Sequence, residues 1–329
     1  MSSKKLAARI AATAALVCAA TGLTIAPSDA ATAPVSNAHV LVPWSLAKGE
    51  QPENITAAPD GDLLITLSRA DEVVEVTPAG RQRVVVKLPA PADGGVHTPV
   101  LGFAFLGGIV RTPDGTLYLA YSTGNADTTG IWRVRPGRAP ERVVALGAGS
   151  FANGMALDPR TGQIYFADST AGVVWRFSDR GRVRAAVWAS DAKLRPTGVF
   201  GLGANGVKVH SGAVWVSNSD QKSLMRIPIR RDGTAGAVET TFTGSALDDF
   251  TFIKDSDVVV GAFDPDNEVA IIRPDGSYRV VLDASDGLQG PTSVQISHGK
   301  LYVNSAAFVT QKDPNLLVAD IDIRAAIHG

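Results

Sequence analysis

The chain has 329 residues, a formal net charge of −1 at neutral pH and 45% hydrophobic residues. A chain of this length and hydrophobicity can bury a substantial core, which excludes a disordered protein. The near-zero net charge gives no basic surface excess, which argues against nucleic acid as a partner.

The first 30 residues have the pattern of a secretory signal peptide. Basic residues within 4–9 precede an apolar run over 10–26, and small residues follow at 28–30. This order of a basic, an apolar and a small-residue segment directs export and is then removed. We predict cleavage after Ala30, with Ala33 as the alternative position, and therefore a secreted, extracellular protein.

Two other interpretations of the N-terminus are disfavoured. An uncleaved membrane anchor would need a longer and more apolar run than 10–26, which contains three threonines and a glycine. A lipoprotein would need a better match than residues 15–17 before Cys18. Cys18 is the only cysteine, so the exported domain has no disulfide. The most apolar later segment, 100–110, is too short to span a membrane, so no span is expected after signal removal.

A strand pattern recurs six times along the rest of the chain. The copies begin 43 to 54 residues apart, which is the length of a propeller blade of four short strands. A tight turn precedes each copy, as in Pro59-Asp60-Gly61, and a third apolar strand follows it. The copies are 63–68 (LLITLS), 117–122 (LYLAYS), 164–169 (IYFADS), 214–219 (VWVSNS), 258–263 (VVVGAF) and 301–306 (LYVNSA).

An outer strand follows the third strand in five units, as in 83–88 (RVVVKL), but not in the sixth. Residues 39–44 (HVLVPW) have the missing pattern and precede the first inner strand. We therefore predict an all-β, six-bladed β-propeller with four antiparallel strands per blade, closed by the N-terminal strand 39–44 in the last blade. The predicted propeller spans 39–323, between a short linker at 31–38 and a tail at 324–329.

Four oxygen-bearing residues begin the inner strands, nine to eleven residues before the repeated strand. They are Glu53, Asn153, Asn205 and Asp249, in the first, third, fourth and fifth units. The second and sixth units have Leu106-Gly107 and Pro291-Thr292 there. In a closed ring the four residues meet on the axis. Carboxylate and amide oxygens without His or Cys suit a hard cation, so we predict Ca²⁺ or a similar divalent cation as cofactor.

Each of these residues also has a simpler interpretation. Asn-Gly, as in Asn153-Gly154 and Asn205-Gly206, is the commonest tight-turn dipeptide. Glu53 taken alone is compatible with an exposed position, and Asp248-Asp249 with a charged loop. The recurrence of an oxygen ligand at one repeat position favours the shared metal site.

Several motifs resemble the gluconolactonase/regucalcin family of six-bladed propellers, with paraoxonase a more distant relative. The resemblance extends over nearly the whole predicted exported chain. It is carried by 52–55 (PENI), 152–158 (ANGMALD), 164–169 (IYFADS) with 172–175 (GVVW), and 204–207 (ANGV).

The resemblance implies a set of metal ligands. In the gluconolactonase/regucalcin family a Glu of the first blade, an Asn of the third and an Asp of a later blade hold the cation. Glu53 and Asn153 match the first two, and Asn205 stands where the Asp would fall. Paraoxonase uses a Glu, two Asn and an adjacent Asp-Asn pair, and here the pair is Asp248-Asp249. The paraoxonase order is the closer match and adds Asp248 to the ligands.

The leading functional hypothesis is a metal-dependent hydrolase of small lactone or ester substrates. A bound divalent cation polarises a carbonyl oxygen and stabilises the oxyanion formed when water attacks. Asp248 or Asp249 is the first candidate for the general base. His97, in the loop 89–99, is a further candidate, with an ordinary loop histidine as the simpler interpretation. Leu106 replaces the polar residue with which sugar-lactone enzymes of the family hold substrate, which predicts a less polar substrate than an aldonolactone.

Two other functions compete with this hypothesis. One is a non-catalytic extracellular binding propeller in which the ion only stabilises the ring. The other is a condensing propeller similar to strictosidine synthase, which is disfavoured because those relatives lack this ligand set. Asp127 and the turn 263–266 lie on the predicted ligand side and are interpreted as solvated turns.

Overall fold

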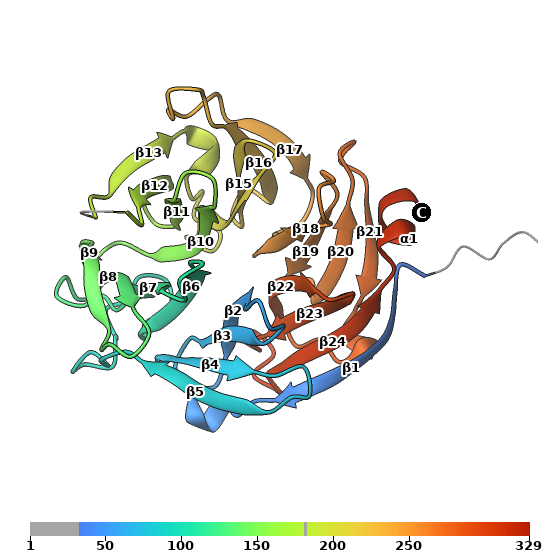
Figure 1. The fold of residues 1–329 in the computed structure, drawn as a ribbon, viewed down its shortest axis with the longest axis horizontal. Helices are drawn as coiled ribbons and strands as arrows, with labels where there is room; N and C mark the ends of the chain where they lie inside the picture. Colours follow the sequence, from blue (N-terminus) through green and yellow to red (C-terminus); the bar gives the residue numbers. More distant parts are fainter. Residues whose placement is uncertain (1–32, 181–182) are drawn as a thin grey trace, which may run out of the picture.

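The computed structural model describes residues 33–180 and 183–329. Their strands form six four-stranded antiparallel sheets, arranged as the blades of a ring (Figure 1). The predicted all-β six-bladed propeller is confirmed. Within the described ranges, no helix has the length and apolar character needed to cross a membrane. The predicted signal peptide, with Cys18, lies outside the described residues.

Each blade begins with its inner strand at the axis. Blade 1 consists of β2 (Pro52–Ala57), β3 (Leu63–Leu67), β4 (Glu72–Val76) and β5 (Gln82–Lys87). Blade 2 consists of β6 (Phe105–Arg111), β7 (Leu117–Ser122), β8 (Gly130–Val134) and β9 (Glu141–Ala145). Blade 3 consists of β10 (Ala152–Asp158), β11 (Gln163–Asp168), β12 (Val173–Ser178) and β13 (Ala186–Ser190).

The second half of the chain continues the series. Blade 4 consists of β14 (Ala204–His210), β15 (Ala213–Asn218), β16 (Ser223–Pro228) and β17 (Glu239–Thr243). Blade 5 consists of β18 (Phe250–Phe252), β19 (Val259–Phe263), β20 (Glu268–Ile272) and β21 (Tyr278–Leu282). Blade 6 consists of β22 (Pro291–Ser297), β23 (Lys300–Ser305), β24 (Asn315–Ile321) and β1 (Val35–Pro43).

The N-terminal strand closes the ring as predicted. β1 pairs antiparallel with β24, from Val35 opposite Ile321 to Pro43 opposite Asn315. It begins four residues before the predicted strand start, within the segment expected to be a linker. The chain then ends in the short helix α1 (Ile323–His328), where a tail was expected. The closing strand leaves the outer edge of β24 paired, which protects the last blade from edge-to-edge association.

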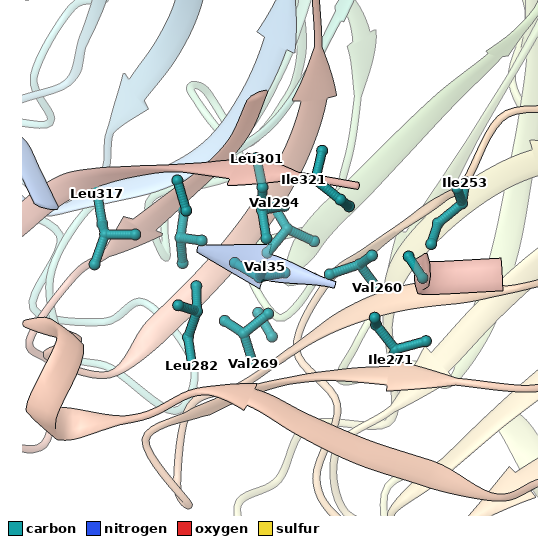
Figure 2. Close-up of a cluster of buried hydrophobic side chains, with 14 of the residues drawn as sticks. Val35, Ile253, Val260, Val269, Ile271, Leu282, Val294, Leu301, Leu317 and Ile321 are labelled. Atoms are coloured by element: carbon teal, nitrogen blue, oxygen red, sulfur yellow. The ribbon is translucent and has the colours of Figure 1, made fainter. Parts of the chain in front are cut away.

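The hydrophobic core is divided among the six interfaces between neighbouring blades. Successive residues of β3 show why, because Leu63 and Ile65 pack toward blade 6 while Leu64 packs toward blade 2. Alternate side chains of a strand point to opposite sheet faces, and here both faces are buried. Figure 2 shows the cluster between blades 5 and 6, where Val35 of β1 lies among Val269, Leu301 and Ile321. The closing strand therefore contributes to a core.

Hydroxyl groups join neighbouring blades near the axis. Each donates to a backbone carbonyl at the start of the next blade's inner strand or just before it. The bonds are Thr66 Oγ1 to Gly107 O (2.8 Å), Ser169 Oγ to Ala204 O (2.7 Å), Ser217 Oγ to Asp248 O (2.7 Å) and Thr292 Oγ1 to Pro52 O (3.0 Å). They satisfy buried carbonyls and fix the spacing of the inner strands.

Candidate functional site

Three of the predicted ligand residues, Glu53, Asn153 and Asn205, lie at β-bulges. In β10 the pairing with β11 runs from Ala152 directly to Met155, so Asn153 and Gly154 stand outside the ladder. A bulge turns a side chain out of the sheet alternation and toward a new direction. The same irregularity occurs at the start of four other inner strands, between Pro52 and Ile55, Leu106 and Ile109, Ala204 and Val207, and Pro291 and Ser293.

The tight-turn interpretation of the two Asn-Gly pairs is wrong. Both pairs lie in strands, and neither Gly154 nor Gly206 has a positive φ. Glycine is required there because neighbouring inner strands approach closely. A Cβ on Gly154 would lie 2.5 Å from the carbonyl oxygen of Asn205, and one on Gly206 would lie 2.7 Å from that of Asp248. The glycines allow the ring to narrow at the level of the ligand residues.

Both asparagines are held by a serine at the end of the repeated strand. Asn153 Nδ2 donates to Ser169 Oγ at 3.3 Å, and Asn205 Nδ2 donates to Ser219 Oγ at 2.8 Å. Within residues 33–180 and 183–329, nothing donates a hydrogen bond to either Oδ1. An amide whose nitrogen is fixed by the blade leaves its carbonyl oxygen available to a cation.

Three carboxylates accompany the asparagines. Glu53 is 4% exposed, and neither its Oε2 nor Oδ1 of Asp264 has a hydrogen-bond partner among the described residues. The Asp248 carboxylate accepts one bond, from Asn205 Nδ2 at 2.6 Å. None of the ion pairs between described residues includes Glu53, Asp248 or Asp264. Buried acceptors without donors mark a place where a ligand is expected.

Burial and mutual repulsion act on these carboxylates together. Burial, then the charge of Asp248, raises the pKa of the Glu53 carboxyl well above its ordinary value. Burial, then the charge of Asp264, does the same for the pKa of Asp248. Burial raises the pKa of Asp264 to about 6. Burial disfavours the charged forms, and no ion pair among the described residues compensates them.

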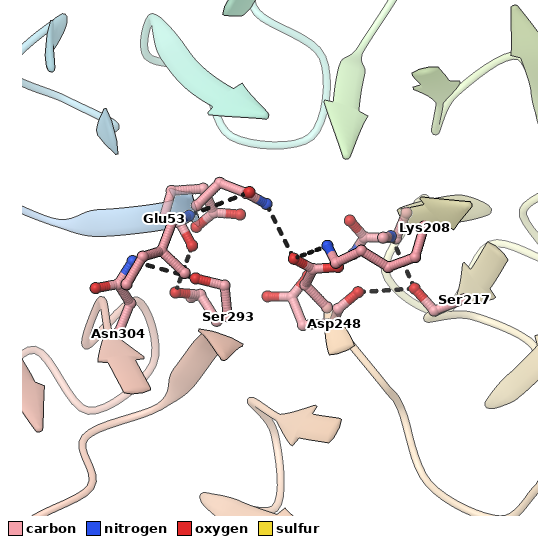
Figure 3. Close-up of polar contacts among 12 residues, drawn as sticks. Glu53, Lys208, Ser217, Asp248, Ser293 and Asn304 are labelled. Carbon is pink, nitrogen blue, oxygen red and sulfur yellow. Dashed lines mark hydrogen bonds and ion pairs between the residues drawn. The ribbon is translucent and has the colours of Figure 1, made fainter. Parts of the chain in front are cut away.

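One cavity collects these groups. It has a volume of about 330 Å³ and lies where the inner strands begin, on the side of the ring that we call the upper face, which carries the loops 88–104, 191–203 and 306–314. Its polar lining is Glu53, Asn153, Asn205, Asp248, Asp264 and Ser219. The rest of the lining is apolar and includes aromatic side chains from strand β6 and from three loops. Figure 3 shows Glu53 on one side of the axis and Asp248 on the other.

Asp249 is separated from this cavity. Both of its carboxylate oxygens accept from Lys208 Nζ at 2.6 Å, and Oδ2 accepts from Asn54 Nδ2 at 3.2 Å. Lys208 and Asn54 line a second space of about 290 Å³ at the lower end of the axis. The structure therefore brings four of the five predicted ligands to the upper cavity and directs Asp249 to the cation of Lys208. This pairing does not support Asp249 as the general base.

Two other predicted positions differ from expectation. His97 is 77% exposed and lies 4.0 Å from Asp93, and it is not part of the cavity lining, so the structure does not bring this catalytic candidate to the site. Leu106 was expected to bound the substrate, but it is fully buried in the core between blades 1 and 2. Phe105 lines the cavity instead and stacks on Phe151 with ring centroids 4.8 Å apart.

Asp264 is the site residue that the sequence interpretation missed. It follows β19 on the ligand side, within the turn 263–266, which was interpreted as solvated. The approach of Gly290 to its carboxylate helps to bury it. Its sequence signal was the position of an Asp directly after the repeated strand, on the same face as the ligands.

The donor set fits a hard divalent cation only when the amide oxygens are counted. In the described part of the chain, no three His, Cys, Asp or Glu side chains are placed to hold a metal ion by themselves. Two carboxylates, Glu53 and Asp248, with the carbonyl oxygens of Asn153 and Asn205, would balance a divalent charge and supply oxygen ligands. The unpartnered Oε2 of Glu53 and the free Asn oxygens are consistent with that role.

Comparisons with known proteins identify solved structures with a similar fold. No family model matches the chain, and no curated protein matches it by sequence. Among solved structures, a gluconolactonase from Xanthomonas campestris has 14% identity and a TM-score of 0.65 over 89% of this chain and 93% of its own. Virginiamycin B lyase from Staphylococcus aureus, solved with quinupristin, has 14% identity and a TM-score of 0.57 over 84% and 82%.

A third similar structure has no enzymatic name. An auxiliary nutrient binding protein from Bacteroides ovatus has 10% identity and a TM-score of 0.62 over 88% of this chain and 76% of its own. Identities this low show the fold alone. The chain is thus a six-bladed propeller of the kind found in gluconolactonases, a fold that unrelated functions share.

Proposed function

We propose that the protein is a secreted, calcium-dependent hydrolase of small lactones or esters. The observation that carries the proposal is the upper cavity, in which buried acceptors of Glu53, Asn153, Asn205 and Asp248 converge without a cation of the protein. The likeness to gluconolactonase folds supports a lactone substrate, and the apolar cavity wall supports one less polar than a sugar lactone.

Glu53, Asn153, Asn205 and Asp248 would hold the cation. When bound, the cation supplies polarisation of the substrate carbonyl and charge for the oxyanion. The serines that fix the asparagine amides orient the ligands, a supporting role that partners of metal ligands commonly have. The narrow ring at Gly154 and Gly206 keeps the set in place.

Asp264 replaces Asp248 and Asp249 as our candidate for the general base. It lines the cavity and has a free carboxylate oxygen, and burial raises its pKa to about 6 before a cation binds. A nearby cation lowers that pKa, so the carboxylate is ionised at neutral pH and can accept a proton from water.

The experiment measures bound calcium and the hydrolysis of a panel of lactones and aryl esters, with and without chelator. Wild type is compared with Glu53→Gln, and Glu75→Gln on the exposed Arg83 pair serves as a matched control. We expect chelator and Glu53→Gln each to reduce turnover by about 10³-fold or more, and the control to leave it unchanged. Turnover that survives both changes would refute the metal mechanism.

Two further readouts separate the alternatives. Bound calcium without turnover of any substrate would favour a binding propeller, which the nutrient-binding neighbour makes a specific candidate. Because another neighbour is a lyase, products formed in H₂¹⁸O should be analysed. Hydrolysis incorporates ¹⁸O into the acid product, whereas elimination gives an unsaturated product without it.

A further inference from the structure

Exposed apolar side chains surround the mouth of the upper cavity. Val309 and Val199 are 71% and 67% exposed, and three further exposed residues lie on the loops 88–104 and 191–203. We call the set Val96, Val100, Val199, Phe200 and Val309 the apolar collar. Large apolar side chains are costly to leave in water, and a cluster of them on one face marks a binding surface.

The other exposed large hydrophobic residues of the described chain have a different location. They all lie on outer strands, at Val40, Val84, Val187, Tyr278 and Val280. Single apolar residues on an outer strand are ordinary features of a blade surface. Among the described residues, the collar is the only group of exposed large hydrophobic side chains on loops. Its three loops are far apart in the sequence, so the fold brings them together.

The collar continues into the cavity wall. Val100, Phe200 and Val309 also line the cavity, together with Phe105, Phe151 and Phe308. Phe308 lies 6.4 Å from Phe105 between ring centroids, and Phe105 stacks on Phe151. One apolar surface therefore runs from the carboxylates and amides of the floor, past the aromatic wall, to the outside of the protein.

The loops that carry the collar are held in place. The Asp220 carboxylate accepts backbone N–H bonds from Thr197 and Gly198, both at 2.8 Å, and from Phe200 at 2.5 Å. These bonds fix the part of the loop 191–203 that carries Val199 and Phe200. Preorganised apolar contacts lose less entropy when a ligand covers them.

The loop 88–104 is strained at the collar. Val100 has a φ of 67°, which a β-branched residue rarely adopts. A Cβ on Gly201 would contact Val100 Cγ2 at 3.4 Å, so this loop meets the neighbouring one over the cavity. Strained residues persist where the surrounding structure holds them, often beside ligands.

We propose that the substrate carries an aliphatic chain longer than the cavity, with its ester or lactone carbonyl on the polar floor and its tail across the collar. This inference rests on the proposed hydrolase function and specifies its substrate class. A chain that covers both wall and collar gains from each methylene removed from water, whereas a short ester reaches only the wall.

The test is a series of p-nitrophenyl esters from acetate to dodecanoate and of γ-lactones of matching length. We expect kcat/KM of wild type to rise about two- to fourfold per methylene until the collar is covered. Val199→Ser and Val96→Ser, at collar residues outside the cavity lining, should reduce kcat/KM for the long chains by a larger factor than for acetate. Val84→Ser and Val187→Ser, on outer strands, should leave the whole series unchanged.

The inference fails if wild type hydrolyses all chain lengths equally, or if the rise survives in both collar variants. It also fails if the collar variants lose only their binding to phosphatidylcholine vesicles, because the collar would then contact a lipid surface. If wild type hydrolyses no ester at all, the proposed function fails, and calorimetry with decanoate and butyrate still tests the collar. Tighter binding of decanoate that is lost in the collar variants supports it, and equal binding overturns it.

Discussion

The two ends of the propeller axis treat buried carboxylates in opposite ways. At the lower end Asp249 has its own cation, because Lys208 Nζ lies 2.6 Å from each of its oxygens. At the upper end Glu53, Asp248 and Asp264 share a cavity, and no ion pair of the described residues includes them. Figure 3 shows Asp248 next to Lys208, so the two arrangements are close neighbours.

This difference in charge compensation indicates a structural role for the lower end and a functional role for the upper end. A buried carboxylate costs free energy unless a partner compensates its charge. The lower end is compensated within the chain and is therefore structural. The upper end is left for a cation from outside, which is the property expected of a functional site. Removing a charge at one end and comparing the result with a matched change elsewhere tests this difference.

The largest effect is expected from removing the lower cation. Lys208→Met leaves Asp249 buried and unpaired, which should lower the free energy of unfolding by about 3–5 kcal/mol. Lys300→Met removes a cation from the exposed pair with Asp320, so it should change the free energy of unfolding far less. Denaturant unfolding of both variants measures the difference. Adding Asp249→Asn to Lys208→Met should recover much of the loss, and no recovery would contradict the pairing.

At the upper end the same type of change should have the opposite sign. In chelator at pH 8, Glu53→Gln removes a buried charge without a partner and should stabilise the protein by about 1–3 kcal/mol. In excess calcium the order should reverse, because wild type gains binding free energy that the variant loses. Thermal unfolding in both solutions measures this crossing. A variant less stable than wild type in both would show that Glu53 is structural.

A smaller effect is expected from Asp264. Its folded pKa of about 6 lies above the ordinary value of 3.8, so its contribution to stability is present below pH 3.8 and is lost as pH rises through about 6. In chelator, the free energy of unfolding of wild type should therefore fall by about 1–2 kcal/mol more between pH 4 and pH 7 than that of Asp264→Asn. Unfolding at a series of pH values measures it. An unchanged pH profile would place the Asp264 charge in solvent.

The smallest effect is expected from Asp71. This residue is buried in the β3–β4 turn and does not line the upper cavity. Burial raises its pKa to about 6 as well. Asp71→Asn is compatible with its φ of 58°, because Asn tolerates the left-handed region. Asp71→Asn should reduce the pH dependence of stability over the same pH range as Asp264→Asn does. Calcium should change the effect of Asp264→Asn and leave the effect of Asp71→Asn unchanged. Equal calcium sensitivity would contradict a local upper site.

The repeat made the fold predictable from the sequence. Each copy reports the same structural position, so β7 begins and ends where its pattern does, and the ring closure follows from one missing outer strand. The repeat also located Glu53, Asn153 and Asn205 together. The positions of these residues follow from their spacing to the repeated strand, which can be read directly from the sequence.

The remaining features depend on single-residue geometry and on loops. Asp248 and Asp249 are adjacent in the sequence, but their carboxylates have different partners. Asn205 of the neighbouring blade donates to Asp248, and Lys208 of the same blade donates to Asp249. Phe105 rather than Leu106 faces the cavity because a shift of one residue at a strand reverses the side. Asp264 is buried by contacts with loops from elsewhere, which no local pattern reports.

Isothermal titration with CaCl₂ at pH 7.5 tests most directly whether the upper end is completed by a cation. We predict one ion bound per chain, with proton release, because the raised pKa values of Glu53, Asp248 and Asp264 fall when the cation binds. Glu53→Gln should weaken binding by at least about 100-fold, and Lys300→Met should leave it unchanged. Absence of binding, or equal affinity in wild type and Glu53→Gln, would contradict the account.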